Sequence, residues 1–242
     1  MRIDQLWRYP VKSFGGERVR TATIEPDGLL GDHVWAVLDA DSGNVASAKR
    51  FRRYGDLLSC SARLLDDNDP RDPAALELVL PDGTVIRGDD ADVHGMLSQV
   101  VHRDVRLEAR PRTYDEAPVH LVSVSAVDAL GTGESAEIAV RRFRPQIVVD
   151  TPGSPGFVED EWIGGHIAAG SAVLGPDKPT ARCVMVTLTH QEVPARREML
   201  RGITAVHQVP SGSDGKPAPC IGVYATVLTP GCISVGDDVL VR

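Results

Sequence analysis

The stretch Thr180-Ala181-Arg182-Cys183-Val184-Met185-Val186-Thr187-Leu188-Thr189 places a cysteine beside an arginine at the head of an apolar, β-branched run. The alternation along residues 184–189 predicts a short strand. Pro176 and Pro179 precede it, so we expect Cys183 to lie where a loop enters this strand. The Arg182 cation favours the thiolate, which attacks electrophiles and binds soft metals. Unpaired cysteines are also often inert and buried, so the stretch alone leaves both interpretations open.

Composition bounds the class of protein. A chain of 242 residues suits one large domain or two small ones tightly joined, with a substantial buried core. A net charge of −8 argues against a nucleic-acid partner. A local basic pocket for a phosphorylated ligand remains possible, because arginines cluster twice. These clusters, which equally suit solvated surfaces, are Arg50, Arg52 and Arg53, and Arg141, Arg142 and Arg144.

The cysteines and the apolar runs indicate a cellular location. Cysteines stand at positions 60, 183, 220 and 232, and no pair has the spacing of a zinc site or a thioredoxin motif. Sparse cysteines fit a reducing compartment. The N-terminus lacks an apolar signal core, and no apolar run approaches the length that spans a bilayer. We therefore expect a cytoplasmic protein that does not enter a membrane.

Periodicity predicts many short strands and few helices. We expect strands over 2–9, 57–65, 76–80, 85–86, 103–107, 119–123, 147–149, 221–227 and the last residues before 241. Helical spacing or capping signals favour helices over 89–101, 124–130 and 195–201. The polar, proline-bracketed segment 110–118 is the expected domain boundary.

A turn-rich loop follows the first predicted strand. Tyr9-Pro10-Val11-Lys12-Ser13-Phe14-Gly15-Gly16 sets a cation and a hydroxyl beside exposed backbone amides, which is a suitable set for a phosphate. It lacks the glycine pattern of a Walker motif, so from its residues alone it is equally an ordinary hairpin loop.

These segments together resemble a known family. The loop 9–13, the turn Gly28-Leu29-Leu30-Gly31-Asp32, the run Arg144-Pro145-Gln146-Ile147-Val148-Val149, Arg182-Cys183, and the closing proline-glycine and glycine-aspartate turns resemble, in order, the MOSC domain and its N-terminal β-barrel domain. The resemblance covers the chain from Tyr9 to Val241. It implies a mostly β (α+β) fold with few short helices. An N-terminal β-barrel-like domain over residues 1–110 would pack on a MOSC β-barrel over residues 118–242, with a cleft between them.

The resemblance also implies a cofactor site. In the amidoxime-reducing members the cysteine that matches Cys183 ligates molybdenum, which makes Cys183 the expected catalytic residue and metal ligand. The residues expected to hold the molybdopterin are Lys12, Ser13, Lys49, Arg50, Arg144, Gln146 and Arg182. Relatives carry arginine where His33 stands and asparagine where Gln146 stands. Glu159 and Asp160, beside Trp162, resemble a family segment in which we expect the acids to cap or orient the arginines.

The resemblance therefore implies a molybdenum-molybdopterin oxidoreductase. It would reduce N-hydroxylated or N-oxide-like small molecules with electrons from a separate donor protein. A cofactor carrier or sulfur-transfer module with a persulfide on Cys183 is an alternative, as is a cofactor-free relative that binds another ligand. Pyridoxal phosphate binding is a further property that the family admits.

Overall fold

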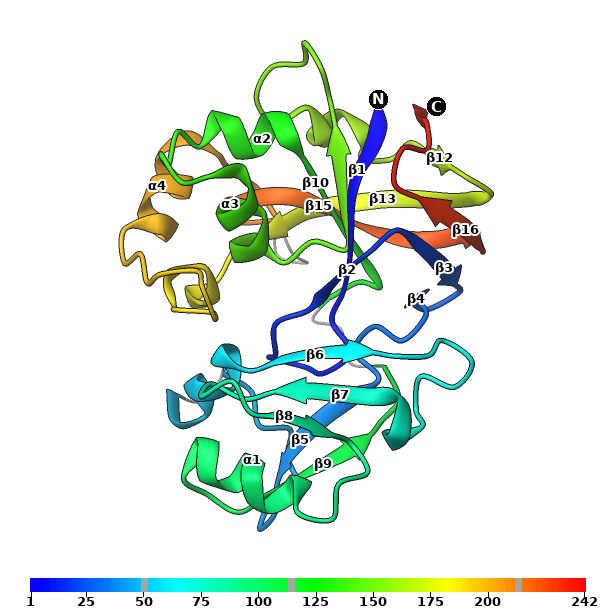
Figure 1. Cartoon of the computed structure of the whole chain (residues 1–242). Coiled ribbons are helices and arrows are strands. Elements are labelled where there is room, and N and C mark those ends of the chain that lie inside the picture. The colour runs from blue at the N-terminus through cyan, green and yellow to red at the C-terminus, as the bar shows by residue number, and fades with distance from the viewer. Residues whose placement is uncertain (49–51, 113–115, 212–214) are drawn as a thin grey trace.

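The computed structural model describes residues 1–48, 52–112, 116–211 and 215–242. Strands dominate it and the helices are short, so the predicted mostly β fold is confirmed. Figure 1 shows a larger upper part, which contains both ends of the chain, and a smaller lower part. No helix within the described residues combines the length and the apolar character that crossing a membrane requires.

The upper part is built on one large sheet. Its strand order is β17-β12-β13-β15-β10-β11-β1-β2, and β14 adds to β15. Strands β10 and β11 are parallel, whereas their neighbours pair antiparallel. The bounds are β1 (Arg2–Arg8), β2 (Glu17–Val19), β10 (Val119–Ser123), β11 (Ile147–Asp150), β12 (Ile167–Ala169), β13 (Ala172–Ala181), β14 (Gln208–Pro210), β15 (Pro217–Thr229) and β17 (Val239–Val241).

Strands from both ends of the chain share this part. A second sheet has the order β16-β3-β4, with bounds β3 (Thr21–Glu25), β4 (Gly28–Leu29) and β16 (Gly231–Ser234). Ile3 and Ile24 are buried in the same core cluster as Leu121 and Val223. The first and last strands also meet, because Val239 N–H donates to the Met1 carbonyl over 2.9 Å.

The lower part has a core of its own. It comprises a two-stranded sheet, a three-stranded sheet, helix α1 and two 3-10 turns, and its buried cluster draws only on residues 11–107. The bounds are β5 (Trp35–Asp39), η1 (Arg52–Ser59), β6 (Ser61–Leu64), η2 (Pro73–Ala75), β7 (Leu76–Val79), β8 (Val85–Arg87), α1 (Val93–Val101) and β9 (Val105–Ala109). The predicted boundary at 110–118 thus follows β9. Before it, however, β1 pairs with β11 and β3 pairs with β16, both of which lie beyond the boundary.

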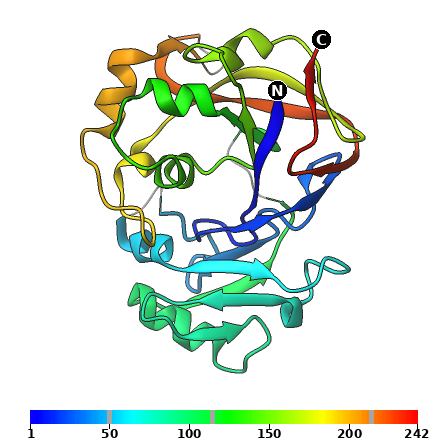
Figure 2. The ribbon, with the colours of Figure 1, turned by 45° about the horizontal axis from the view of Figure 1, so that its top comes forward.

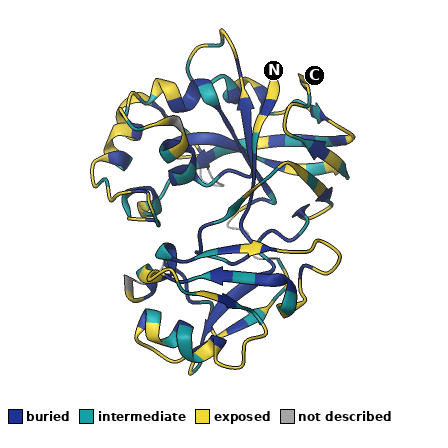
Figure 3. Cartoon of the chain, in the orientation of Figure 1, coloured by how far each residue is buried: buried dark blue, intermediate teal, exposed yellow. Residues whose placement is uncertain are grey.

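Helices gather at one end of the large sheet, away from the termini, as both Figure 1 and Figure 2 show. Ser123 caps α2, because its hydroxyl accepts from Ala126 N–H over 3.0 Å, which agrees with the capping signals that favoured a helix over 124–130. Ser135 caps α3 in the same way. The bounds are α2 (Val124–Ala129), α3 (Ala136–Phe143), η3 (Val158–Trp162), η4 (Val184–Thr187) and α4 (Met199–Val206). Figure 3 shows that these helices bury one face and expose the other.

The strand predicted over residues 184–189 is wrong. Pairing of β13 with β15 ends at Ala181, so the residues after Cys183 close on their own carbonyls and form η4. Cys183 therefore follows a strand rather than preceding one. Pro176 and Pro179 lie inside β13, next to shifts in its register with β15. A missing N–H is tolerated at such irregular positions, which explains why the prolines do not end the strand.

Further element predictions need correction. The helix predicted over 89–101 begins only at Val93. Residues 57–59 belong to the 3-10 turn η1, and only Ser61–Leu64 of the strand predicted over 57–65 is extended. The helix predicted over 195–201 begins later, at Met199, and continues to Val206.

Candidate functional site

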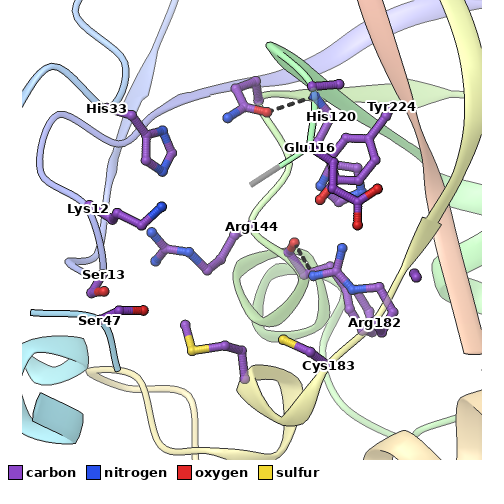
Figure 4. Close-up of a pocket in the computed structure, with 15 residues that line it drawn as sticks. Lys12, Ser13, His33, Ser47, Glu116, His120, Arg144, Arg182, Cys183 and Tyr224 are labelled. Atoms are coloured by element: carbon purple, nitrogen blue, oxygen red, sulfur yellow. Dashed lines mark hydrogen bonds between the residues drawn. The ribbon is translucent and has the colours of Figure 1, made fainter. Parts of the chain in front are cut away.

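A cavity opens between the upper and lower parts of the molecule (Figure 4). Loop 10–16, the turn before β5 and Ser47 form one wall. The other walls come from β10 and the residues before it, the end of α3, the residue before β11, β13, η4 and β15. The lining residues are Lys12, Ser13, His33, Ser47, Glu116, Ala117, His120, Phe143, Arg144, Gln146, Ala181, Arg182, Cys183, Met185 and Tyr224.

Positive charge prevails in this cavity. Lys12, Arg144 and Arg182 line it, and Figure 4 shows the Arg144 guanidinium extending toward the Lys12 amine. Glu116 is the carboxylate of the lining, and its Oε2 lies 3.0 Å from Lys178 Nζ at the rim. Cations held together in a partly enclosed cavity attract an anion. The cavity therefore suits a phosphorylated or otherwise anionic ligand.

The loop at residues 10–16 is rigidly built. Lys12 N–H donates to the Trp35 carbonyl over 3.0 Å, which ties the loop to β5. Ser13 has a left-handed backbone, with φ of 72°, and its hydroxyl accepts from Ala48 N–H over 3.5 Å. A side chain at Gly16 would collide with the Arg8 carbonyl, so this turn requires glycine. The backbone thus fixes where the Lys12 amine and the Ser13 hydroxyl enter the cavity.

Arg144 is held by its position at the end of α3. It caps the helix in the left-handed conformation, with φ of 55°, and its N–H donates to the Val140 carbonyl over 3.0 Å. The guanidinium lies 4.3 Å from the centroid of the Tyr9 ring, within range of a cation–π contact. Burial raises the pKa of Tyr9, so this ring stays neutral. Both features fix the guanidinium on the cavity wall.

Cys183 and Arg182 lie on the opposite wall, at the junction of β13 and η4. Cys183 is half-buried and caps η4 in an extended conformation. Arg182 Nη2 donates to the Phe143 carbonyl over 2.9 Å, which anchors the side chain. Its Nε is buried and has no hydrogen-bond partner within the part of the chain that the structure describes. A buried donor without an acceptor is costly, so this guanidinium is suited to an anionic oxygen of a ligand.

Gln146 is engaged at both ends of its side chain. Its Oε1 accepts from His120 N–H over 2.8 Å, and its Nε2 donates to Asp32 Oδ2 over 3.1 Å. Asp32 also accepts from Tyr9 N–H and lies 2.5 Å from His33 Nδ1. The amide therefore fastens β11 to β10 and to the turn that carries His33. This geometry favours positioning over direct contact with a ligand.

Sequence reasoning missed His120. Its ring is buried, Nε2 lies 3.2 Å from the Ile221 carbonyl, and the ring packs 5.6 Å from Tyr224. Burial lowers the pKa of His120 to about 3, with a further contribution from the Arg182 charge. The imidazole is therefore a neutral wall of the cavity. A lone histidine in an apolar strand carries no signal of this role, because the neighbours that create it are distant in sequence.

The cavity brings together most of the predicted site residues. Cys183, Lys12, Ser13, Arg144, Gln146 and Arg182 all line it. Lys49 and Arg50 lie outside the described residues, so their predicted contacts stay predictions. His33, the departure from the family pattern, also lines the cavity.

Other arginines and acids named in the sequence analysis do not line this cavity. Arg142 is fully buried beneath η4, where it pairs with Glu134 and donates to the Val186 carbonyl over 3.0 Å. The expectation that Glu159 and Asp160 orient arginines is wrong. Glu159 accepts from the Ser123 hydroxyl and from Gly222 N–H, and Asp160 Oδ2 lies 2.8 Å from His207 Nε2. Both acids join strands and turns of the upper part.

The donor set fits a metal held by a cofactor rather than by the chain alone. Within the described ranges, His, Cys, Asp and Glu do not gather in a group of three that could hold a metal ion. A soft metal at Cys183 would need its other ligands from a bound group. The cations and the unpaired Arg182 Nε suit the anionic end of such a group.

Fold and cavity together define a two-part β protein with a cysteine-bearing, cationic site between its parts. The MOSC domain model matches residues 90–240, and the model of the MOSC N-terminal beta barrel domain matches residues 1–67. The chain belongs to the MOSC domain family.

Several named proteins are similar to this chain along nearly its whole length. Mitochondrial amidoxime-reducing component 1 of Homo sapiens is 28% identical, over 98% of this chain and 82% of that protein. The Xenopus laevis protein of the same name is 27% identical, over 98% of this chain and 81% of that protein. The solved YuaD protein of Bacillus subtilis matches with a TM-score of 0.47 and 12% identity, over 99% of this chain and 94% of that one.

Proposed function

We propose that this protein is a molybdenum-molybdopterin oxidoreductase that reduces N-hydroxylated or N-oxide-like small molecules. One observation carries the proposal: the Cys183 thiol and the cations Lys12, Arg144 and Arg182 line a single cavity. The similar proteins named amidoxime-reducing components support the class of reaction.

Each part of the cavity then has a role in holding the cofactor. The Cys183 thiolate is the protein's ligand to the metal. Lys12, Ser13 and Arg144 bind the phosphate and the pterin through charge-assisted hydrogen bonds. The Arg182 guanidinium supplies a further donor, and Gln146 holds the wall in place through Asp32 and His120. When bound, the cofactor supplies the two-electron chemistry.

The overall reaction also defines the partners. Breaking an N–O bond consumes two electrons and two protons and releases water. The similar proteins named amidoxime-reducing components support electrons that come from a separate donor protein. The small-molecule substrate enters through the open side of the cavity. All four cysteines are free thiols, which suits the reducing cytoplasm that we propose as the location.

The decisive measurement is molybdenum per chain, with pterin detection, on protein made in a host that synthesises the cofactor. Wild-type protein should carry near-stoichiometric metal, and Cys183→Ala should lose most of it along with activity, because the thiolate bond is removed. Cys232→Ala is the matched control, since Cys232 is exposed and outside the cavity, and should retain the metal. Cys183→Ala protein with full metal and activity would refute the ligand role.

A sulfur-transfer role for Cys183 is the second candidate, favoured by the half-buried thiol beside Arg182. Protein of this kind would carry sulfane sulfur on Cys183, visible as a mass increase of the peptide, without turnover of N-hydroxylated compounds. Wild-type chains with neither metal, pterin nor persulfide would instead point to a cofactor-free relative that binds another anion.

A further inference from the structure

A tight turn crosses from the upper to the lower part beside the cavity. His190 N–H donates to the Val193 carbonyl over 3.0 Å, and Val193 N–H donates back to the His190 carbonyl over 2.7 Å. Gln191, at the tip, has a left-handed backbone with φ of 47°. The reciprocal bonds hold the tip residue in a conformation that is uncommon for a residue other than glycine.

The Gln191 side chain bridges the two parts. Its Nε2 donates to the Cys60 carbonyl over 3.4 Å, and its Oε1 accepts from Arg141 Nη2 over 2.9 Å. A side chain at Gly15 would collide with the same carboxamide, so Gln191 packs directly on the backbone of the lower part. Gly15 itself is fixed, because its N–H donates to the Cys60 carbonyl over 2.8 Å.

Each end of this bridge is tied to one wall of the cavity. On one side, Gly15 follows Ser13 by two residues in the rigid loop that carries Lys12. On the other side, His190 Nε2 lies 2.8 Å from the Met185 carbonyl, within η4 and two residues after Cys183. Burial lowers the pKa of His190 to about 4, so a neutral ring makes this contact. The turn therefore links the lysine-serine wall to the cysteine wall.

We propose that Gln191 is a positioning residue that holds these two walls at a fixed separation and so limits access to Cys183. The inference rests on the proposed function and deepens it. The separation of the walls determines whether a cofactor bound to the Cys183 thiolate also reaches the Lys12 and Ser13 side chains. The geometry of the bridge, however, is a property of the chain alone. It is therefore testable without the cofactor.

The test is the rate of alkylation at Cys183. Full-length protein from a host that lacks molybdopterin synthesis is treated with iodoacetamide, and site-resolved mass spectrometry follows Cys183 and Cys232. Gln191→Ala should raise the Cys183 rate at least about threefold, since local opening free energies set access to a half-buried thiol. Cys232 lies far from the turn, so its alkylation rate should not change.

Glu192→Ala is the matched control. Glu192 is the next residue and also pairs with Arg141, over 2.7 Å, but its side chain is exposed and does not reach the lower part. This variant should alkylate at the wild-type rate. A wild-type rate in Gln191→Ala, or an equal increase in Glu192→Ala, would overturn the proposal.

Gly15→Ala perturbs the contact between Gly15 and Gln191 through its lower-part residue. Gly15 lies outside the left-handed region, so the collision with Gln191 is the main effect of the added methyl group. If the two residues act through one contact, the effects of Gly15→Ala and Gln191→Ala should combine to less than the product of the separate rate increases. Independent, multiplicative effects would contradict the bridge. Molybdenum content decides the cofactor question separately, so failure of one proposal is distinguishable from failure of the other.

Discussion

Glu159 is a carboxyl group that the fold keeps away from water. Its side chain is fully buried, Oε1 accepts from Gly222 N–H over 3.1 Å, and Oε2 contacts the Ser123 hydroxyl. Burial raises the pKa of Glu159 to about 7, because the charged form loses its hydration. The residue thus joins β10 to β15 and η3 as a neutral acid below that pH.

Glu159→Gln should be clearly more stable than wild-type protein at pH 8, and the difference should fall to about 1 kcal/mol at pH 5. The raised folded-state pKa means that the folded protein keeps the proton while the unfolded chain releases it near pH 4.5, so this contribution to stability is lost as the pH rises toward 7. The difference should reach roughly 3 kcal/mol at pH 8, at about 1.4 kcal/mol per unit of pKa. Urea unfolding of both proteins at each pH measures it.

The comparison of Glu159→Gln with wild-type protein isolates the contribution of the Glu159 carboxyl group. Burial lowers the pKa values of His120 and His190 to about 3 and about 4, so these residues change stability with the opposite sign at acidic pH. They do so equally in both proteins and cancel in the difference. A difference that does not change between pH 5 and pH 8 would show that Glu159 is ionised throughout.

Local motifs predicted the residues of the cavity better than the contacts that organise it. Lys12, Ser13, Arg144 and Cys183 stand in short segments whose order along the chain resembles the family, so their convergence was predictable. Gln146 was assigned to the ligand, yet its amide is engaged by His120 and Asp32, one of them 114 positions away in sequence. Such pairings depend on the tertiary fold, which periodicity and spacing do not describe.

At the scale of elements, one buried arginine contacts both η4 and the segment after it. Arg142 is fully buried and pairs with Glu134. It also donates to the carbonyls of Val186 and Pro194, each over 3.0 Å. Arg142 therefore joins two segments without regular strand pairing to α3, in addition to the contacts of Arg141 with Gln191 and Glu192.

Arg142→Met should lower the free energy of unfolding by roughly 3 kcal/mol, because the Val186 and Pro194 carbonyls lose this donor. The Glu134 carboxylate also loses its shorter ion pair and keeps the one with Arg196, at 3.6 Å. Urea unfolding measures the loss. Arg63→Ala removes a pair with Glu77 in which the arginine side chain is exposed, and it should cost less than about 1 kcal/mol. Equal losses in the two variants would show that Arg142 does not anchor these segments.

The same arginine shows why the strand over 184–189 was predicted wrongly. Val184, Val186 and Leu188 alternate as in a strand, but an extended conformation persists only where a neighbouring strand supplies backbone partners. Here pairing with β15 ends at Ala181, and Arg142 and His190 instead take up carbonyls of η4. Alternation over so few residues does not reveal the absence of a partner strand.

At the scale of the whole molecule, the two parts are not successive segments of chain. The core of the upper part contains Ile3, Leu6, Ile24 and Leu29 from the N-terminus, and β1 lies between β11 and β2 in the large sheet. The predicted domains 1–110 and 118–242 follow the linker rather than this pairing. Composition predicted the linker because polar, proline-rich segments can be recognised in the sequence. The pairing of β1 with β11 joins residues more than a hundred positions apart, and no local sequence pattern indicates it.

A fragment of residues 118–242 should therefore fail to fold alone. Without β1 and β3 the strand β11 loses its antiparallel neighbour, and Leu121, Ile147 and Ile233 lose apolar partners in the core. Each large apolar side chain left exposed costs about 1.5–3 kcal/mol, and several such losses are comparable to the 5–15 kcal/mol that typically stabilises a domain. The amide spectrum of this fragment should show the narrow dispersion of an unfolded chain, and adding a peptide of residues 1–30 should restore dispersed signals. A cooperatively folded 118–242 fragment would instead establish that the N-terminal strands only dock on a domain that is complete without them.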